Sequence, residues 1–265
     1  MSTIRSILRA AKARIAQLVP GAGLHQSVAA GPLEGMVLLL PGAWEARYTH
    51  GEYEPEVAAA LSRLVKPGDT CVDAGAHYGY FTLLLARLCG PGGHVYSFEA
   101  QAENARILRE NVRANQLQPR VTVEQAAVAP RSGQVDLHPA SMGSEEWTLM
   151  ESFAHRDARP RISRPSERTH AVRLDEYLIS APRVDVIKMD IEGAEAEVIP
   201  AISGFLELRR PGLVLEFHRE VGWPAIDALL ASGYGLETLD GEPIPRPRGP
   251  DDVPYQLVGR PRDAT

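Results

Sequence analysis

Two glycines frame a short turn whose residue types suit ligand binding. The stretch CVDAGAHYGYF covers residues 71–81 and places Asp73 two positions before Gly75, with Gly79 four positions further on. Apolar residues precede the aspartate and return at helical spacing after the second glycine, which predicts a strand, a tight turn and a helix. Glycine lets the backbone of such a turn approach a ligand closely, and the N–H groups that begin the helix point toward it.

An acidic residue ends the next predicted strand. Glu99 closes HVYSFE at residues 94–99. In a parallel sheet the ligand crevice lies beyond the carboxyl ends of the strands, where such an acid accepts hydrogen bonds from ribose hydroxyl groups. A dinucleotide fingerprint would require glycines where His77 and Tyr80 stand, so a nicotinamide cofactor is disfavoured. The turn and the acid together predict an adenosine-containing ligand.

A second group of charged residues follows two later strands. VIKMDIEGAE places Lys188 and Asp190 on one face because side chains alternate along a strand, and VLEFH does the same for Glu216 and His218. Neighbouring parallel strands would bring these four catalytic candidates to one sheet edge. Two chemistries stay open there. His218 or Asp190 takes or orients a proton, or Asp190 and Glu216 hold a divalent metal ion.

The elements that must position these residues alternate along the chain from residue 52 onward. Five segments are predicted as buried strands: TCVDAG, HVYSFE, RVTVEQAAV, VDVIKMDIE and GLVLEF. Helices are predicted between them, among them YFTLLLARLC and AEAEVIPAISGFLELRR, and a closing hairpin is expected from YGLETL and YQLVGR. Strands that are apolar almost throughout and separated by helices indicate an α/β fold, with a doubly wound, mostly parallel sheet covered on both faces.

Two segments stand apart from this alternation. Residues 1–51 form an N-terminal extension that begins with a basic amphipathic helix. We expect this helix to dock on the main domain, residues 52–265, or on a second copy in a homo-oligomer; membrane-surface contact is the alternative. Residues 139–170 lack periodicity and are rich in serine, proline and arginine, which predicts a long insertion loop, either a lid or a solvated loop.

Composition narrows the class of protein. The 265 residues carry a formal net charge of −6, which produces no field that would attract nucleic acid. The two cysteines lack metal-ligand spacing, so neither a disulfide framework nor a zinc site is predicted, and a cytoplasmic protein is expected. No apolar run reaches the roughly 18 residues of a transmembrane helix.

Six sequence segments occur in an order that is typical of one protein family. They are VDAGAHYGYFTLLLAR, GGHVYSFEAQAENARILRENVRANQL, VTVEQAAVAPRSGQVDLH, AVRLDEYL, VDVIKMDIEGAEAEVI and RPGLVLEFH. Together they resemble the FkbM-type S-adenosylmethionine-dependent methyltransferases. The resemblance implies a seven-stranded class I methyltransferase sheet with the last strand inserted antiparallel. It also implies S-adenosylmethionine as cofactor and O-methyl transfer to a hydroxyl of a sugar, glycolipid or natural-product scaffold.

The same resemblance implies roles for individual residues. It assigns Asp73, Gly75, Ala76, His77 and Gly79 to the methionine part of the cofactor, Glu99 to the ribose, and Ala126 and Ala127 to the adenine. His77 stands where asparagine is usual in the family, which leaves the contact at that position open.

Two other functions remain as alternatives. A non-catalytic adenosine-binding or scaffold protein would keep the sheet without the chemistry, and an NAD-dependent oxidoreductase would require the missing glycine pattern. The leading prediction implies a small-molecule or glycan acceptor that bears a hydroxyl group. Titration with S-adenosylmethionine, S-adenosylhomocysteine and NAD distinguishes a methyltransferase from an oxidoreductase. Turnover with a panel of substrates distinguishes a methyltransferase from a non-catalytic scaffold protein.

Overall fold

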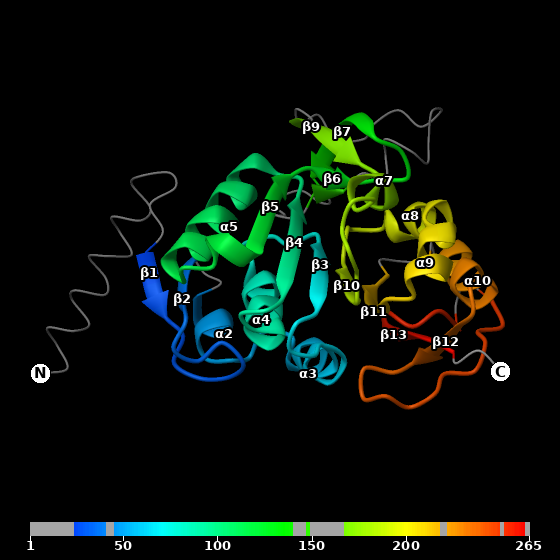
Figure 1. The fold of residues 1–265 in the computed structure, drawn as a ribbon, viewed down its shortest axis with the longest axis horizontal. Helices are drawn as coiled ribbons and strands as arrows, with labels where there is room; N and C mark the ends of the chain where they lie inside the picture. The colour runs from blue at the N-terminus through cyan, green and yellow to red at the C-terminus, as the bar shows by residue number, and fades with distance from the viewer. Residues whose placement is uncertain are drawn as a thin grey trace, which may run out of the picture.

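A seven-stranded sheet runs through the centre of the molecule (Figure 1). The structure is a computed structural model that describes residues 24–40, 45–139, 147–148, 167–217, 222–249 and 252–262. In spatial order the strands of this sheet are β12 (Tyr234–Glu237), β13 (Gln256–Pro261), β11 (Gly212–Glu216), β10 (Val186–Met189), β3 (Thr70–Ala74), β4 (His94–Glu99) and β5 (Val121–Gln125).

The strand directions follow the class I methyltransferase pattern. Neighbouring strands from β11 to β5 are parallel, whereas β13 runs antiparallel to both β11 and β12. The predicted α/β class, the mostly parallel sheet and the inserted antiparallel last strand are confirmed. Because parallel strands end at one edge, the residues that follow β3, β4, β10 and β11 meet there.

Helices cover both faces of the sheet, and each face buries its own apolar core (Figure 1). One face carries α3 (Pro55–Leu64), α4 (Tyr80–Cys89) and α5 (Ala102–Ala114), and the other carries α7 (Leu174–Tyr177), α8 (Glu195–Ala201), α9 (Ser203–Arg209) and α10 (Trp223–Ala231). Val72 and Ile187 pack toward α8–α10, whereas Cys71 and Val186 pack toward α3–α5. Alternation along the strands therefore turns Asp73 and Lys188 toward α3 and α4.

Part of the predicted N-terminal extension packs directly on this domain. A hairpin of β1 (Leu24–Ser27) and β2 (Val37–Leu40) lies against α5, and the short α2 (Glu45–Thr49) follows it. Asn111 of α5 connects the hairpin with the turn before α4, because its side chain accepts from Leu39 N at 2.5 Å and donates to Tyr78 O at 2.7 Å. The predicted amphipathic helix near the start of the chain lies outside the described residues.

A second, smaller sheet occupies part of the predicted insertion. Its strand order is β6 (Ala127–Val128), β9 (Glu167–Val172), β7 (Gly133–Pro139) and β8 (Trp147–Thr148). β7 pairs antiparallel with both β8 and β9, so residues 139, 147–148 and 167–170 of the predicted 139–170 loop belong to strands. The remainder of that loop, residues 140–146 and 149–166, lies outside the described residues, and the proposed lid lies with it.

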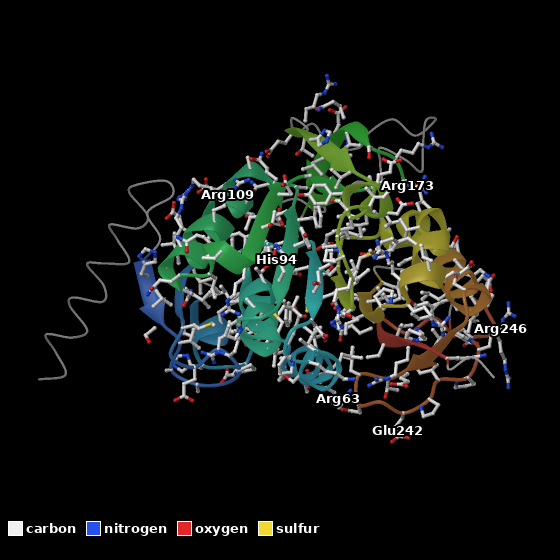
Figure 2. All side chains as sticks on the ribbon, viewed as in Figure 1. Arg63, His94, Arg109, Arg173, Glu242 and Arg246 are labelled. Atoms are coloured by element: carbon white, nitrogen blue, oxygen red, sulfur yellow. The ribbon has the colours of Figure 1, made fainter. Side chains whose placement is uncertain are left out.

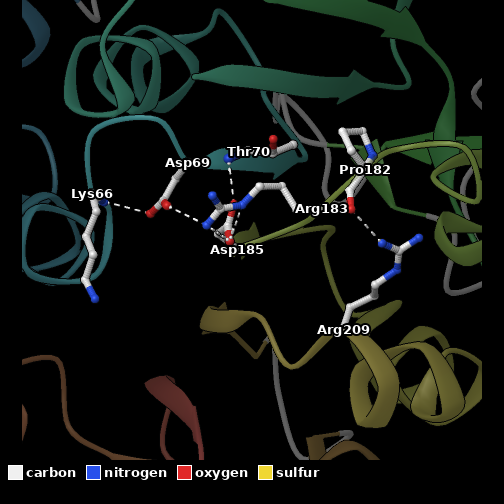
Figure 3. Close-up of polar contacts among 7 residues, drawn as sticks. All are labelled: Lys66, Asp69, Thr70, Pro182, Arg183, Asp185 and Arg209. Atoms are coloured by element: carbon white, nitrogen blue, oxygen red, sulfur yellow. Dashed lines mark hydrogen bonds and ion pairs between the residues drawn. The ribbon is translucent and has the colours of Figure 1, made fainter. Parts of the chain in front are cut away.

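An ion-pair network closes the amino ends of the central strands (Figure 3). Asp185 Oδ2 accepts from Thr70 N at 2.8 Å, which ties the start of β10 to the start of β3. Arg183 joins the same group through Asp69 Oδ1 at 3.3 Å and through Asp185. These contacts tie the strands together at the amino edge, opposite the carboxyl edge where ligands bind in sheets of this kind.

Asn111→Ala should destabilise the domain. Asn111 is fully buried, and its removal leaves Leu39 and Tyr78 backbone groups without their partner, which should lower the free energy of unfolding by about 2–4 kcal/mol. Urea denaturation followed by circular dichroism measures this loss. Arg113→Ala on the exposed side of α5 is the matched control and should change the free energy by about 0.5 kcal/mol or less. Equal effects would contradict the docking role.

Candidate active site

The glycine turn between β3 and α4 is shaped by close backbone packing. Gly75 has φ +79°, and a Cβ built there would lie 1.7 Å from the Asp190 carbonyl oxygen. Gly79 has φ +92°, and its Cβ would lie 2.3 Å from Leu108 Cδ1. Both positions thus favour glycine for conformation, and Gly75 also requires it for space, because the atom it approaches belongs to the backbone. The close approach at Gly75 is to the end of β10, where Asp190 N also donates to Ala74 O at 3.0 Å.

The N–H groups of this turn are used within the protein. Gly75 N and Ala76 N both donate to Phe98 O, at 3.0 and 2.9 Å, and Gly79 N donates to Ala76 O. His77 N donates to Glu99 Oε2 at 2.8 Å. The sequence pattern predicted that the N–H groups at the start of α4 are directed at a ligand; the four N–H groups described here belong to the turn before α4, so that prediction stays a prediction.

Glu99 braces the turn from the end of β4. Its Oε1 accepts from Gln101 N at 2.9 Å and has a longer contact of 3.5 Å with Asn104 Nδ2, while Oε2 accepts from His77 N. A carboxylate offers about four lone-pair sites, so one acceptor site remains on Oε2. Burial raises the pKa of Glu99 to about 7, although the N–H donors of Gln101 and His77 lower it. The contact of Glu99 with a ribose hydroxyl stays a prediction, and Oε2 is the oxygen with an acceptor site left for it.

His77 itself adopts a left-handed backbone conformation with φ 49°. Asparagine and histidine are both enriched in that region, which explains how histidine can occupy a position where the family has asparagine. The ring centroid lies 3.8 Å from that of Tyr78. Burial lowers the pKa of His77 to about 4, with a smaller contribution from the Lys188 charge, so the ring is neutral at pH 7.

Asp73 lies beneath the turn. It is fully buried, and its Oδ2 accepts from Thr82 Oγ1 at 2.6 Å. Its Oδ1 has no hydrogen-bond partner among the described residues and lies 4.0 Å from Lys188 Nζ. Burial raises the pKa of Asp73, while Lys188 and Thr82 lower it. The side chain therefore lies below the turn, between Thr82 and Lys188.

Lys188 is the buried cation of the site. It is 5% exposed, in contrast to surface cations such as Arg63 and Arg246 in Figure 2. Its Nζ lies 3.5 Å from Asp190 Oδ2 and 5.1 Å from the centre of the Phe81 ring. Burial lowers the pKa of Lys188, but four carboxylates, Asp190 first, raise it above the ordinary value. The ammonium group stays charged at neutral pH and does not act as a base there.

Glu216 reaches the same edge from β11. The register pairs Met189 with Leu215, so Asp190 and Glu216 follow side by side. Glu216 accepts from Gln256 Nε2 at 2.7 Å and from the Tyr255 hydroxyl. The structure thus brings Lys188, Asp190 and Glu216 together as predicted by strand alternation. His218, the fourth catalytic candidate, lies outside the described residues.

A narrow recess opens beside these residues and adds one that the sequence did not single out. It encloses no space large enough for a water molecule and is therefore a shallow surface recess, lined by Glu54, Val57, Lys188, Met189, Val214, Leu215, Glu216 and Gln256. Glu54 directly precedes Pro55 at the start of α3. The glutamate before a helix-starting proline is a visible sequence signal, but it indicates only a helix boundary.

Adenine contacts and metal binding stay as predictions. Ala126 and Ala127, each 3% exposed, lie directly after β5 in the apolar core. Within the described ranges, no group of three or more His, Cys, Asp or Glu side chains is arranged to hold a metal ion. No helix in the same ranges is long and apolar enough to span a membrane.

The strand order and the glycine turn at the end of β3 define a class I methyltransferase. The chain belongs to the FkbM methyltransferase domain family, whose model matches residues 73–234. The family predicted from the sequence blocks is confirmed. S-adenosylmethionine, the predicted cofactor, is the methyl donor of this class.

Two curated proteins share parts of the sequence. The chain is 42% identical over 60 residues to a protein-L-isoaspartate O-methyltransferase of Aeropyrum pernix, covering 22% of this chain and 23% of that protein. It is 28% identical over 151 residues to the 2-O-methyltransferase NoeI of Sinorhizobium fredii, covering 52% of this chain and 59% of that protein. The alignments thus span less than two thirds of either relative.

Solved structures with a similar fold include two methyltransferases. The FkbM methyltransferase of Methylobacillus flagellatus is 18% identical with a TM-score of 0.49, and the alignment covers 79% of this chain and 51% of that one. An O-methyltransferase of Bacillus cereus in complex with SAH is 16% identical with a TM-score of 0.46, covering 79% of this chain and 82% of that one.

Gly75→Ala should destabilise the protein more than Gly68→Ala. Both glycines have positive φ, at +79° and +89°, but a Cβ at Gly68 meets nothing within 4 Å. Gly68→Ala should cost about 1–2 kcal/mol of unfolding free energy for conformation alone, while the clash at Gly75 should bring its cost to about 3 kcal/mol or more. Denaturant titration of both variants tests this. Equal losses would mean that β10 does not constrain the turn.

Proposed function

We propose that this chain is an S-adenosylmethionine-dependent O-methyltransferase that acts on a hydroxyl of a sugar, glycolipid or natural-product scaffold. The observation that carries the proposal is the carboxylate cluster around Lys188, beside a glycine turn at the carboxyl edge of a methyltransferase sheet. Carboxylates outnumber the ammonium group, so the edge suits a ligand that brings positive charge. S-adenosylmethionine carries a sulfonium and an ammonium group.

The residues at this edge fit that cofactor in a specific way. We assign the ribose to the remaining acceptor site of Glu99, and the adenine to the side of Ala126 and Ala127. Because the N–H groups of Gly75, Ala76, His77 and Gly79 are occupied, the turn would meet the methionine part through its carbonyl side. These are the cofactor residues predicted from the sequence, with Asp73 lying below the turn beside Lys188.

The chemistry needs an oxygen nucleophile held in line with a methyl group. When bound, the cofactor supplies that methyl group on a positively charged sulfur. Positioning of the reacting atoms alone accounts for a large part of such rate enhancements. Asp190 is suited to orient the acceptor hydroxyl, because it is 21% exposed and its carboxylate is held by Lys188 at 3.5 Å. Lys188 remains a fixed positive charge.

Proton transfer by His218 and metal binding by Asp190 with Glu216 remain as competing proposals. The carboxylate of Glu216 is already bonded to Gln256 and Tyr255, so a metal ion would have to share or displace those donors. Chelation separates the two, because a proton-transfer site keeps its rate in EDTA and a metal site regains its rate with added magnesium or manganese.

The acceptor class is supported by the family resemblance and by one relative named as a 2-O-methyltransferase. A methyl transfer assay tests it. The chain is incubated with methyl-labelled S-adenosylmethionine and a panel of methyl glycosides of hexoses and deoxyhexoses, each paired with its 2-deoxy analogue. We expect label in at least one glycoside and, for a 2-hydroxyl target, none in its 2-deoxy partner. Failure to label any glycoside would contradict a sugar acceptor.

Glu99→Gln should weaken binding of S-adenosylhomocysteine. The amide places an NH2 group against the N–H of His77 or Gln101 and removes a charged acceptor, which should cost about 1.5–3 kcal/mol, or roughly 10- to 150-fold in Kd. Isothermal titration calorimetry measures it, with NAD as the competing ligand. Glu103→Gln, which removes only an exposed ion pair with Arg106, is the control. Unchanged affinity in a folded variant, or preferential binding of NAD, would overturn the cofactor assignment.

A further inference from the structure

Glu54 occupies an unusual place for a residue at the start of a helix. Its backbone is left-handed, with φ 39° and ψ 60°, and within the described part of the chain its side chain makes no capping bond to α3. A non-glycine residue held in this region is strained, and such strain is found at functional sites more often than elsewhere. Capping therefore does not account for the conformation, and the family model, which begins at residue 73, does not cover it.

An aromatic cluster fixes Glu54 beside the glycine turn. Tyr48 and Tyr53 stack with ring centroids 4.2 Å apart, and Tyr53 meets Tyr80 edge-on at 5.2 Å. Tyr80 is the first residue of α4 and directly follows Gly79. The segment before α3 is thus anchored on the element that begins at the turn, and its last residue lines the recess over β10 and β11.

The Glu54 carboxylate faces the charged edge. Its Oε2 is buried and has no hydrogen-bond partner among the residues that the structure describes. Burial raises the pKa of Glu54, the Lys188 charge and a hydrogen bond from Tyr53 lower it, and Glu216 and Asp190 raise it further. The titratable groups around it are Tyr48, Tyr53, Tyr80, Lys188, Asp190 and Glu216. A carboxylate with a raised pKa is a stronger base than an exposed one.

We propose that Glu54 is a further catalytic residue, whose carboxylate faces the reacting methyl group and takes the proton of the acceptor hydroxyl. This inference rests on the proposed O-methyl transfer. The acceptor oxygen forms a bond to the methyl carbon, the carbon–sulfur bond breaks with its electron pair left on sulfur, and the hydroxyl proton moves to the Glu54 carboxylate. Asp190, held by Lys188, orients the hydroxyl during this step.

An experiment without acceptor tests whether the Glu54 carboxylate faces the methyl group of the bound cofactor. The affinities of S-adenosylmethionine and S-adenosylhomocysteine are measured by calorimetry at pH 8 for the wild type, Glu54→Gln and Glu56→Gln. Only the first ligand has a positive sulfur, so a carboxylate facing the methyl group favours it. In Glu54→Gln the carboxylate charge is lost, so the affinity for S-adenosylmethionine divided by that for S-adenosylhomocysteine should fall by about 3- to 10-fold. Glu56 is exposed two positions along, and its variant should keep the wild-type ratio.

The pH dependence of the rate tests the proton role, with the best-labelled glycoside as acceptor. The base works ionised, so the wild-type rate should fall as pH drops through the raised pKa. Glu54→Gln should lose about 100-fold or more at pH 8 and lack that acid limb. If Glu54→Gln fails to fold, Glu54→Asn replaces it, because asparagine tolerates the left-handed conformation.

The outcomes distinguish failure of the role of Glu54 from failure of the proposed O-methyl transfer. An unchanged affinity ratio, or an unchanged pH profile, in a folded Glu54 variant overturns the role of Glu54 and leaves O-methyl transfer standing. A wild type that binds neither cofactor overturns both. If the wild type binds cofactor but labels no glycoside, the sugar acceptor fails, while the affinity ratio still decides whether Glu54 faces the methyl group.

Discussion

A buried ammonium group holds the carboxyl edge of the sheet together. β10 lies between β3 and β11, and its register places Lys188 opposite Asp73 on one side and Val214 on the other. The lysine is enclosed by the Phe81 ring and by carboxylates at 3.5 and 4.0 Å. Loss of one member of a buried ionic group costs roughly 3–5 kcal/mol, because the remaining charges are left without compensation. The acidic residues at this edge are tolerated because Lys188 is among them.

Backbone packing makes the turn and the charged edge one unit. Gly75 touches the Asp190 carbonyl group, and Glu99 holds the turn through His77. A methyl donor seated on the turn, as we propose, would lie next to the end of β10. In that proposed arrangement, the positioning of donor and acceptor would contribute to the rate.

Local periodicity predicted most of the elements. The predicted strand HVYSFE and helix YFTLLLARLC coincide with β4 and α4, because buried strands and amphipathic helices have distinct apolar spacing. One predicted helix, AEAEVIPAISGFLELRR, is instead two, α8 and α9, which meet at Ile202. Pro200 lies inside α8, so the hydrogen bond that it cannot make falls within α8 and does not explain the break at Ile202, which no local sequence signal announces.

The site was predicted less completely, because long-range contacts decide it. Strand alternation placed Lys188, Asp190 and Glu216 at one edge, but it could not show that Asp73 is fully buried under the turn against Thr82. Nor could it show that Asn111 of α5 bridges Leu39 and the turn, or that Glu54 enters the recess. These contacts join residues far apart in sequence, where local spacing carries no information.

The most direct test of the central claim is a crystal structure of the chain with S-adenosylhomocysteine. The account predicts a ribose hydroxyl on Glu99 Oε2, with the sulfur atom directed toward Asp190 and the recess that Glu54 lines. An adenosine group bound away from Glu99, or a sulfur atom on the far side of the turn from Asp190, would contradict it.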